Sequence, residues 1–145
     1  MKSITLALSG GAARGAYHLG VLEYIDYHDI HIEAICATSI GAIVAASYLS
    51  GVKPKEQLEI IKSKAFREVF SFNYFRGSLY QIDFHHEILD QWVHAKNLED
   101  LSKPLYLTAV DLHSGKNLYF NNGDIKTLCM ASSALIPFFP PVLYH

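Results

Sequence analysis

The chain has no excess of charge, few cysteines and no long hydrophobic run, and each absence excludes a class of protein. Its 145 residues carry 12 Lys and Arg against 14 Asp and Glu, a formal net charge of -2, so no basic excess is present to neutralise nucleic-acid phosphates. We therefore expect no nucleic acid as a partner. No run approaches the roughly 18 apolar residues of a membrane span, and no apolar segment of roughly 7 to 15 residues near Met1 suggests a secretory signal peptide.

The cysteines and histidines show no metal-binding spacing. Cys36 and Cys129 lie in apolar segments without a CxxC pair, which argues against a zinc site or a disulfide framework, and reduced thiols fit a cytoplasmic protein. The histidines form no helical i, i+4 pair backed by a carboxylate in the known zinc pattern. The sequence thus predicts no metal and no cofactor.

The residues that are present favour one globular domain. Half of them are hydrophobic and 18% are charged, which suffices for a core. Apolar periodicity and turn residues predict strands at 4–8, 32–38, 104–112 and 117–120, helices at 16–26, 40–49, 54–69, 83–94 and 124–133, a loop at 70–80, and the start of a strand at 136–145. Strands that alternate with helices predict an α/β fold, with a mostly parallel sheet flanked by helices, as a single domain over residues 1–145.

The first candidate site is the small-residue segment from Ser9 to Gly15, where a strand gives way to a helix. Unpaired N–H groups at such a turn can bind an anion. Both common nucleotide loops are excluded, because no GxxxxGK[ST] is present and GGAARG does not have GxGxxG spacing. An oxyanion-binding loop and a plain tight turn both stay open. The candidate oxyanion-binding residues are Gly10, Gly11, Ala12, Arg14 and Gly15.

The second candidate site surrounds Ser39. A nucleophile elbow places a serine at a strand-to-helix turn with small residues two positions before and after it, here Ala37 and Gly41. The alternative is a serine that only caps the next helix, a role that stabilises by about 1 kcal/mol. Because the carboxyl ends of neighbouring parallel strands meet at one edge of a sheet, we expect both turns to meet there. The N–H groups of Gly11 and Ala12 would then face a carbonyl attacked by Ser39.

Four segments together carry a family resemblance. They are Leu8 to Leu22, Ala37 to Ala42, Thr108 to Gly115, and the run Ala-Ser-Ser-Ala-Leu-Ile-Pro-Phe-Phe-Pro-Pro from Ala131 to Pro141. Over nearly the whole chain they resemble the bacterial patatin-like phospholipases. The resemblance implies a lipid or acyl-ester substrate, peripheral contact with a membrane, and ester hydrolysis by a Ser-Asp dyad without histidine or metal. It also implies Ser39 as the nucleophile and an oxyanion loop of Gly10, Gly11 and Ala12.

The chain departs from the family pattern at three places. Ala12 and Ala37 stand where the family has glycine. The aspartate of the family's dyad follows soon after the Phe-Pro-Pro segment, in an Asp-Gly-Gly or Asp-Gly-Ala turn, and no residue of this sequence matches it. Asp111 matches a non-catalytic position and Asp124 a helix cap. We therefore expect a domain that is truncated at its carboxyl end and has very low turnover by itself.

Two further functions stay open. A domain that kept the fold and lost the dyad would be a non-catalytic lipid-binding or scaffolding module. A nucleotide-binding α/β domain is the third hypothesis, against which the missing phosphate-loop lysine argues. For the hydrolase, the aromatic residues of segments 70–79 and 136–141 predict where an acyl chain would lie.

Overall fold

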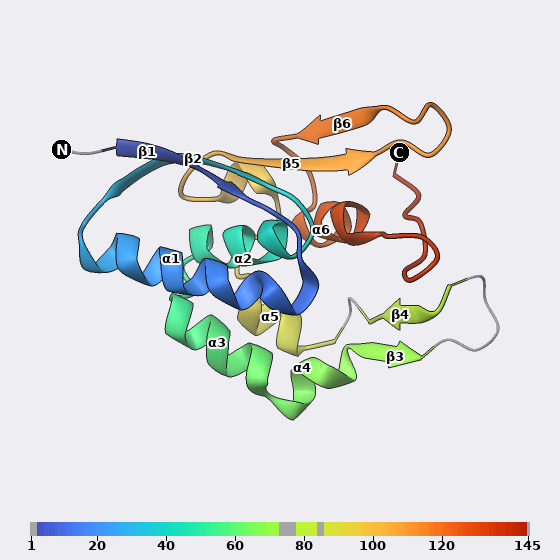
Figure 1. Ribbon diagram of the computed structural model, residues 1–145, viewed down its shortest axis with the longest axis horizontal. Helices are drawn as coiled ribbons and strands as arrows, with labels where there is room; N and C mark the ends of the chain where they lie inside the picture. Colours follow the sequence, from blue (N-terminus) through green and yellow to red (C-terminus); the bar gives the residue numbers. More distant parts are fainter. Residues whose placement is uncertain (1–2, 73–77, 84–85, 145) are drawn as a thin grey trace.

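A four-stranded sheet sets the architecture. The computed structural model describes residues 3–72, 78–83 and 86–144, and its main sheet has the order β1 (Ser3–Leu8), β2 (His31–Ala37), β5 (Leu105–Val110) and β6 (Asn117–Phe120). β1, β2 and β5 are parallel, and β6 returns antiparallel to β5 (Figure 1). The predicted α/β class with a mostly parallel sheet is therefore confirmed.

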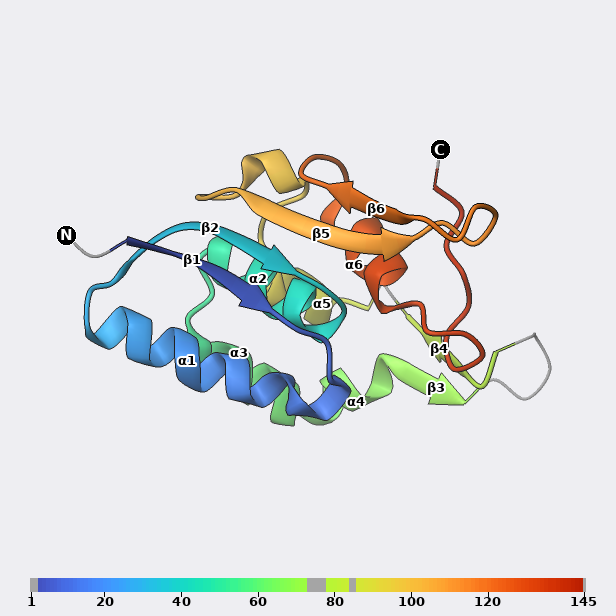
Figure 2. The ribbon, with the colours of Figure 1, turned by 45° about the horizontal axis from the view of Figure 1, so that its top comes forward.

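Three helices pack against one face of this sheet. α1 (Ala16–Tyr27), α2 (Ile40–Leu49) and α6 (Ile125–Ser133) lie below the strands in Figure 1 and stay on that side in Figure 2. Ile35 and Leu105, which are neighbours in the register, are buried. Cys36 and Tyr106, the next pair, are exposed on the opposite face. Alternate residues therefore point to opposite faces, as strand geometry requires.

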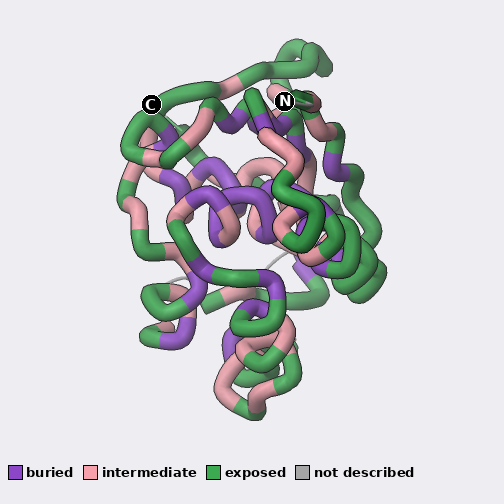
Figure 3. Tube along the Cα trace, turned by 90° about the vertical axis from the view of Figure 1, so that its left-hand side faces the viewer, coloured by how far each residue is buried: buried purple, intermediate pink, exposed green. Residues whose placement is uncertain are grey.

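The centre of the core is α2, whose bounds match the sequence prediction. Its sequence is apolar on nearly every side, and Ala42, Val44, Ala45 and Ala46 are fully buried. A helix that is hydrophobic all round needs cover on all sides, which the sheet, α1 and α6 provide. Figure 3 shows the buried part of the trace in the middle of the molecule.

The helix predicted at 54–69 is wrong in its length. α3 (Pro54–Lys62) begins at the predicted proline but ends at Ser63, whose backbone is extended at φ -64° and ψ 154°. The Ser63 hydroxyl accepts a hydrogen bond from the Phe66 N–H at 3.0 Å and caps a separate short helix, α4 (Lys64–Glu68). A serine side chain that bonds to nearby backbone competes with helix continuation, which explains the break.

The aromatic segment also differs from the prediction. β3 (Phe70–Phe72) and β4 (Tyr80–Ile82) pair as an antiparallel hairpin, whereas a loop is predicted at 70–80, of which residues 73–77 lie outside the described residues. The helix predicted from Asp83 is shorter: α5 (Ile88–Trp92) has Glu87 as its N-cap residue, and the Asp83 N–H donates to the Val69 carbonyl. Residues 84–85 lie outside the described residues as well.

The carboxyl segment forms no strand within residues 134–144, so the prediction of a strand there is wrong for the described part. Two of its carbonyls, those of Pro137 and Phe138, accept hydrogen bonds from the Leu79 and Tyr80 N–H groups at 2.9 and 2.8 Å. Prolines prevent the regular ladder that a strand needs. The segment therefore closes against the hairpin. The short 3-10 turns η1 (Ala12–Gly15) and η2 (Leu98–Asp100) complete the fold.

Candidate active site

The two small-residue turns meet at the carboxyl edge of the sheet. β1 and β2 pair up to Leu8 and Ala37, and the Thr38 N–H then donates to the Leu8 carbonyl at 3.1 Å. A Cβ atom on Gly10 would lie 3.2 Å from the Ser39 Cβ and 3.8 Å from its Oγ. The structure thus brings the glycine loop and Ser39 side by side, at the place where ligands bind in open α/β sheets.

Ser39 occupies a backbone conformation that favours glycine. Its φ is 53° and its ψ is -127°, and conformations of this kind cost about 1–3 kcal/mol for a residue with a side chain. It precedes α2 at the N-cap position, but within the described residues its side chain makes no capping hydrogen bond. The cap alternative raised by the sequence therefore lacks the hydrogen bond that would define it. A capping role therefore does not explain why Ser39 adopts this strained backbone conformation.

Close packing explains two glycines near this bend, Gly41 against the backbone of β1 and Gly15 against the Ile40 side chain. A Cβ atom on Gly41 would lie 2.3 Å from the Leu8 carbonyl oxygen, and one on Gly15 would lie 2.3 Å from the Ile40 Cγ1 atom. Ala37 is 4% exposed and belongs to the hydrophobic core, so its methyl group is accommodated where the family has glycine. Small residues are therefore required at the two glycines by contact with β1 and α2.

The glycine loop adopts a second left-handed conformation. Gly11 has φ 150° and Ala12 has φ 48°, after which the Arg14 N–H donates to the Gly11 carbonyl at 3.0 Å. No hydrogen bond from the Gly10 or Gly11 N–H is found within the described residues. The loop therefore presents free donors beside Ser39. Arg14 is exposed and makes no ion pair with any described residue.

Two side chains that the sequence did not single out hold this edge together. The His18 Nε2–H donates to the Ser9 carbonyl at 2.8 Å and ties α1 to the loop. The Ser39 N–H donates to the Ser132 Oγ at 2.8 Å, and the Thr38 Oγ1 lies 3.4 Å from the same atom. Ser132 falls in the segment 131–141 that carried the resemblance, which was the only signal for it.

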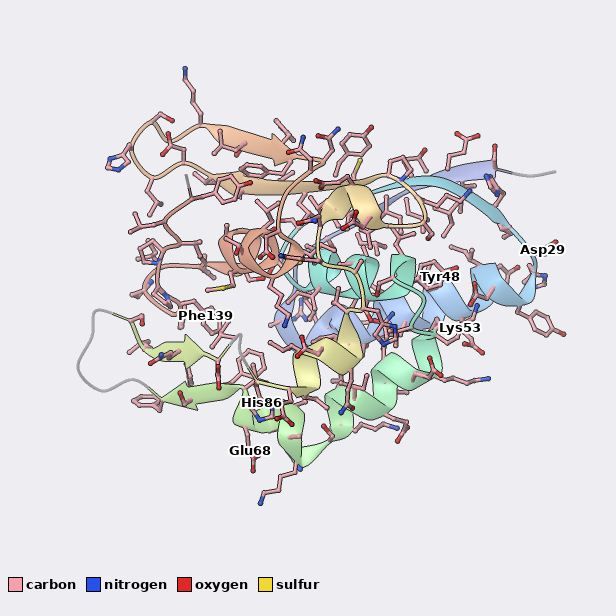
Figure 4. The ribbon with its side chains drawn as sticks, turned by 180° about the vertical axis from the view of Figure 1, so that it is seen from behind. Asp29, Tyr48, Lys53, Glu68, His86 and Phe139 are labelled. Atoms are coloured by element: carbon pink, nitrogen blue, oxygen red, sulfur yellow. The ribbon has the colours of Figure 1, made fainter. Side chains whose placement is uncertain are left out.

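Ser39 opens onto an apolar cavity of about 400 Å³, which falls in the usual range for ligand pockets. Its walls come from α2, α4, α5, α6, the hairpin and the carboxyl segment, and include Ile43, Phe66, Phe70, Trp92 and Phe139. The rings of Phe66 and Trp92 pack edge to face, with 4.7 Å between their centroids. In Figure 4, Phe139 is labelled on the left, above the hairpin, whereas Tyr48 and Lys53 are labelled right of centre. An apolar chain of moderate length fits such a cavity.

Cys129, which lines the cavity, and the two aspartates considered as bases are either unreactive or engaged in other contacts. Burial raises the pKa of the Cys129 thiol to about 12, so it stays protonated and is no nucleophile. Asp124 accepts hydrogen bonds from the Thr127 N–H and hydroxyl and caps α6. Asp111 accepts from the Ser114 hydroxyl and the His113 N–H, bonds that lower its pKa and close the turn before β6. No metal-binding cluster occurs in the described residues.

Comparison with known proteins identifies the family. The sequence model of the patatin-like phospholipase family matches residues 6–144. "Patatin-like phospholipase domain-containing protein 6" of Homo sapiens and of Mus musculus is 28% identical over 152 residues, covering 97% of this chain and 11% of that protein. "Neuropathy target esterase sws" of Drosophila persimilis is 26% identical over 151 residues, covering 97% of this chain and 10% of that protein.

The chain therefore spans about a tenth of the length of these curated relatives. None of the helices in the described residues has the length and hydrophobicity needed to cross a bilayer. The matched residues contain β1 with its glycine loop, β2 with Ser39, and the segment that holds Ser132. The chain belongs to the patatin-like phospholipase family.

Proposed function

We propose that the chain carries the nucleophile, Ser39, and the oxyanion-binding loop of an enzyme that hydrolyses lipid acyl esters. The observation that carries the proposal is the strained serine beside a loop with free N–H donors, at the mouth of an apolar cavity. Family membership supports the substrate class, since the relatives are named as phospholipases and esterases. Besides a base, ester hydrolysis needs these three parts: a nucleophile, a site for the developing oxyanion, and room for the acyl chain.

In the proposed reaction, the Ser39 Oγ attacks the ester carbonyl carbon and gives up its proton to a base. The carbonyl oxygen becomes an oxyanion, which the N–H groups of Gly10, Gly11 and Ala12 stabilise, with Arg14 and Gly15 completing the loop. Each such donor is worth roughly 10²- to 10³-fold in rate. The C–O bond to the alcohol then breaks, the alcohol takes the proton, and water releases the fatty acid from Ser39 by the reverse sequence.

The base of the proposed dyad is an aspartate for which this sequence has no match, and neither Asp111 nor Asp124 takes its place. Both carboxylates are already engaged, one in the turn before β6 and the other at the cap of α6. Ser132, near the carboxyl end of α6, accepts a hydrogen bond from the Ser39 N–H. Eight residues of helix, about 12 Å, therefore separate Asp124 from this contact.

The acyl chain lies in the apolar cavity. Phe70 and Phe139 line it, and they belong to the two aromatic segments that the sequence singled out for this purpose. Phe72, Leu79 and Phe138, from the same segments, are exposed outside the cavity. We propose that these outer side chains make the peripheral contact with a lipid surface, since aromatic and aliphatic side chains partition into the membrane interface.

A second candidate function is lipid binding without turnover. The engagement of Asp111 and Asp124 favours it, because a serine without a base stays protonated near neutral pH. The two candidates share the cavity and differ in the reactivity of Ser39.

A fluorophosphonate probe distinguishes the two candidates. Incubation of residues 1–145, and of any longer natural form of the protein, should add the probe's mass at Ser39. Ser39→Ala should abolish the addition, whereas Ser102→Ala, which removes a hydroxyl at the other end of the sheet, should keep it. An unlabelled protein that still binds a long-chain ester, equally well with Ser39→Ala, would overturn the hydrolase proposal and favour the binding module.

A further inference from the structure

We infer that Ser132 is a positioning residue for the nucleophile, an inference that rests on the proposed function. The Ser39 N–H donates to the Ser132 Oγ at 2.8 Å, across 93 positions of sequence. The Ser132 hydroxyl lies on α6, outside the lining of the cavity, and has no contact with the substrate in the proposed reaction.

The backbone around the bend explains why this hydrogen bond matters. The Thr38 N–H bonds to the Leu8 carbonyl, and the Thr38 and Ser39 carbonyls accept from Gly41 and Ala42 at the start of α2. The Ser39 N–H has no backbone acceptor in β2 or α2 among the described residues, and its partner comes from α6. The Ser132 hydroxyl is that partner. An N–H left without a partner at this partly buried position would cost stability and free the peptide to rotate.

Ser132 is itself held by the core. It follows Leu128 by four positions and Cys129 by three, so it continues the buried face of α6 to the helix end. The other end of α6 is fixed by the Asp124 cap and by the Ile125 N–H, which donates to the Lys96 carbonyl at 2.9 Å. A rigid helix thus presents the acceptor, which makes the position of the Ser39 peptide depend on the packing of α6.

A serine hydroxyl also has a proton of its own. While the Ser132 Oγ accepts from Ser39, its O–H can lie along the 3.4 Å line to the Thr38 Oγ1. The Ser132 hydroxyl then contacts both Thr38 and Ser39. These residues lie on either side of the Thr38–Ser39 peptide bond, and rotation of this peptide would move the Ser39 Oγ. Since a shift of 1 Å at a reacting group can cost about 10²-fold in rate, these two hydrogen bonds of Ser132 set the reactivity of Ser39.

The test compares Ser132→Ala with Ser132→Thr and with Ser102→Ala. The Ser102 hydroxyl donates to the Leu49 carbonyl at 2.8 Å, so its removal deletes a hydrogen bond of equal length far from Ser39. We expect Ser132→Ala to slow fluorophosphonate labelling of Ser39 by roughly 10- to 100-fold and to lower kcat for a soluble ester equally, with KM unchanged. Ser132→Thr, which keeps the hydroxyl, should retain most of the rate, and Ser102→Ala all of it.

Hydrogen exchange of the Ser39 amide gives a second measurement that needs no activity. Exchange should be slow in the wild-type protein and in Ser132→Thr, and fast in Ser132→Ala. Labelling by Ser132→Ala at the rate of Ser102→Ala, or unchanged amide exchange, would overturn the inference. A wild-type protein that the probe never labels would overturn the proposed function instead, and the exchange measurement would still decide whether Ser132 holds the Ser39 amide.

Discussion

Replacement of Gly41 by alanine tests whether the bend depends on close backbone contact. The new Cβ would lie 2.3 Å from the Leu8 carbonyl oxygen, 2.7 Å from its carbonyl carbon and 2.8 Å from the Ser9 oxygen. All three atoms belong to the backbone, so no side chain can move aside. Insertion of a methyl group into a packed core costs about 1–3 kcal/mol, and we expect Gly41→Ala to reach the upper end, about 3 kcal/mol.

The matched control is Gly20→Ala. Gly20 lies inside α1, and a Cβ there would meet nothing within 4 Å. Alanine at an open helical position is favoured over glycine by about 0.5–1 kcal/mol. The same substitution is therefore expected to act with opposite sign at the two glycines.

Urea denaturation followed by fluorescence measures both effects. The single tryptophan, Trp92, is 1% exposed and reports the loss of the core. We expect the midpoint to fall for Gly41→Ala and to rise for Gly20→Ala, with thermal midpoints that move by about 2–4 °C per kcal/mol for a domain of this size. A Gly41→Ala protein as stable as the wild type, with Ser39 still labelled at the wild-type rate, would refute the close approach of β1 to α2.

Three further predictions concern the cavity, a pH-dependent contact and a helix cap. Trp92→Ala should cost about 3–5 kcal/mol, because it empties core volume and removes the hydrogen bond from the indole to Gln57, and esterase assays should show a preference shifted toward longer acyl chains. Burial and a hydrogen bond to Asp26 raise the pKa of the Tyr48 hydroxyl in the folded protein above its usual value near 10. The contribution of this hydroxyl to the free energy of unfolding is therefore complete below about pH 10 and is lost as the pH rises toward the pKa in the folded protein. Unfolding free energies of Tyr48→Phe should accordingly lack this loss at alkaline pH, and an identical alkaline decline in both proteins would contradict the assignment. Asp124→Ala should destabilise by about 1 kcal/mol through the cap of α6 while Ser39 remains labelled, whereas complete loss of labelling in the stable Asp124→Asn protein would make Asp124 the base.

The local signals in the sequence predicted most of the elements that position the site. The apolar run at 40–49 gave the bounds of α2, Asp124 caps α6 as predicted, and the strands at 4–8 and 32–38 match β1 and β2 to within one residue. These signals are periodicity, caps and turns, which act over a few residues and so can be recognised within a short window.

The predictions failed where distant segments compete with local preference. The segment from Phe70 to Tyr80 has no periodicity, yet its ends pair as a hairpin, and the Leu79 and Tyr80 N–H groups bond to carbonyls near Pro137. The hairpin and the carboxyl segment share these hydrogen bonds, so neither could be assigned from its own residues. The strand predicted from Ile136 is absent up to Tyr144, because the prolines of this segment prevent a regular ladder and its carbonyls bond to the hairpin instead.

The sequence by itself determined the class of fold, the strand-to-helix turn at Ser39 and the glycine loop, because small residues and apolar periodicity restrict the backbone locally. Only the tertiary structure decided that Gly10 lies against Ser39, that Ser132 holds the Ser39 amide, and that the cavity has the aromatic walls of Phe66 and Trp92. These contacts join residues far apart in the chain, and their partners are selected by packing of the whole core, which no short window of sequence contains.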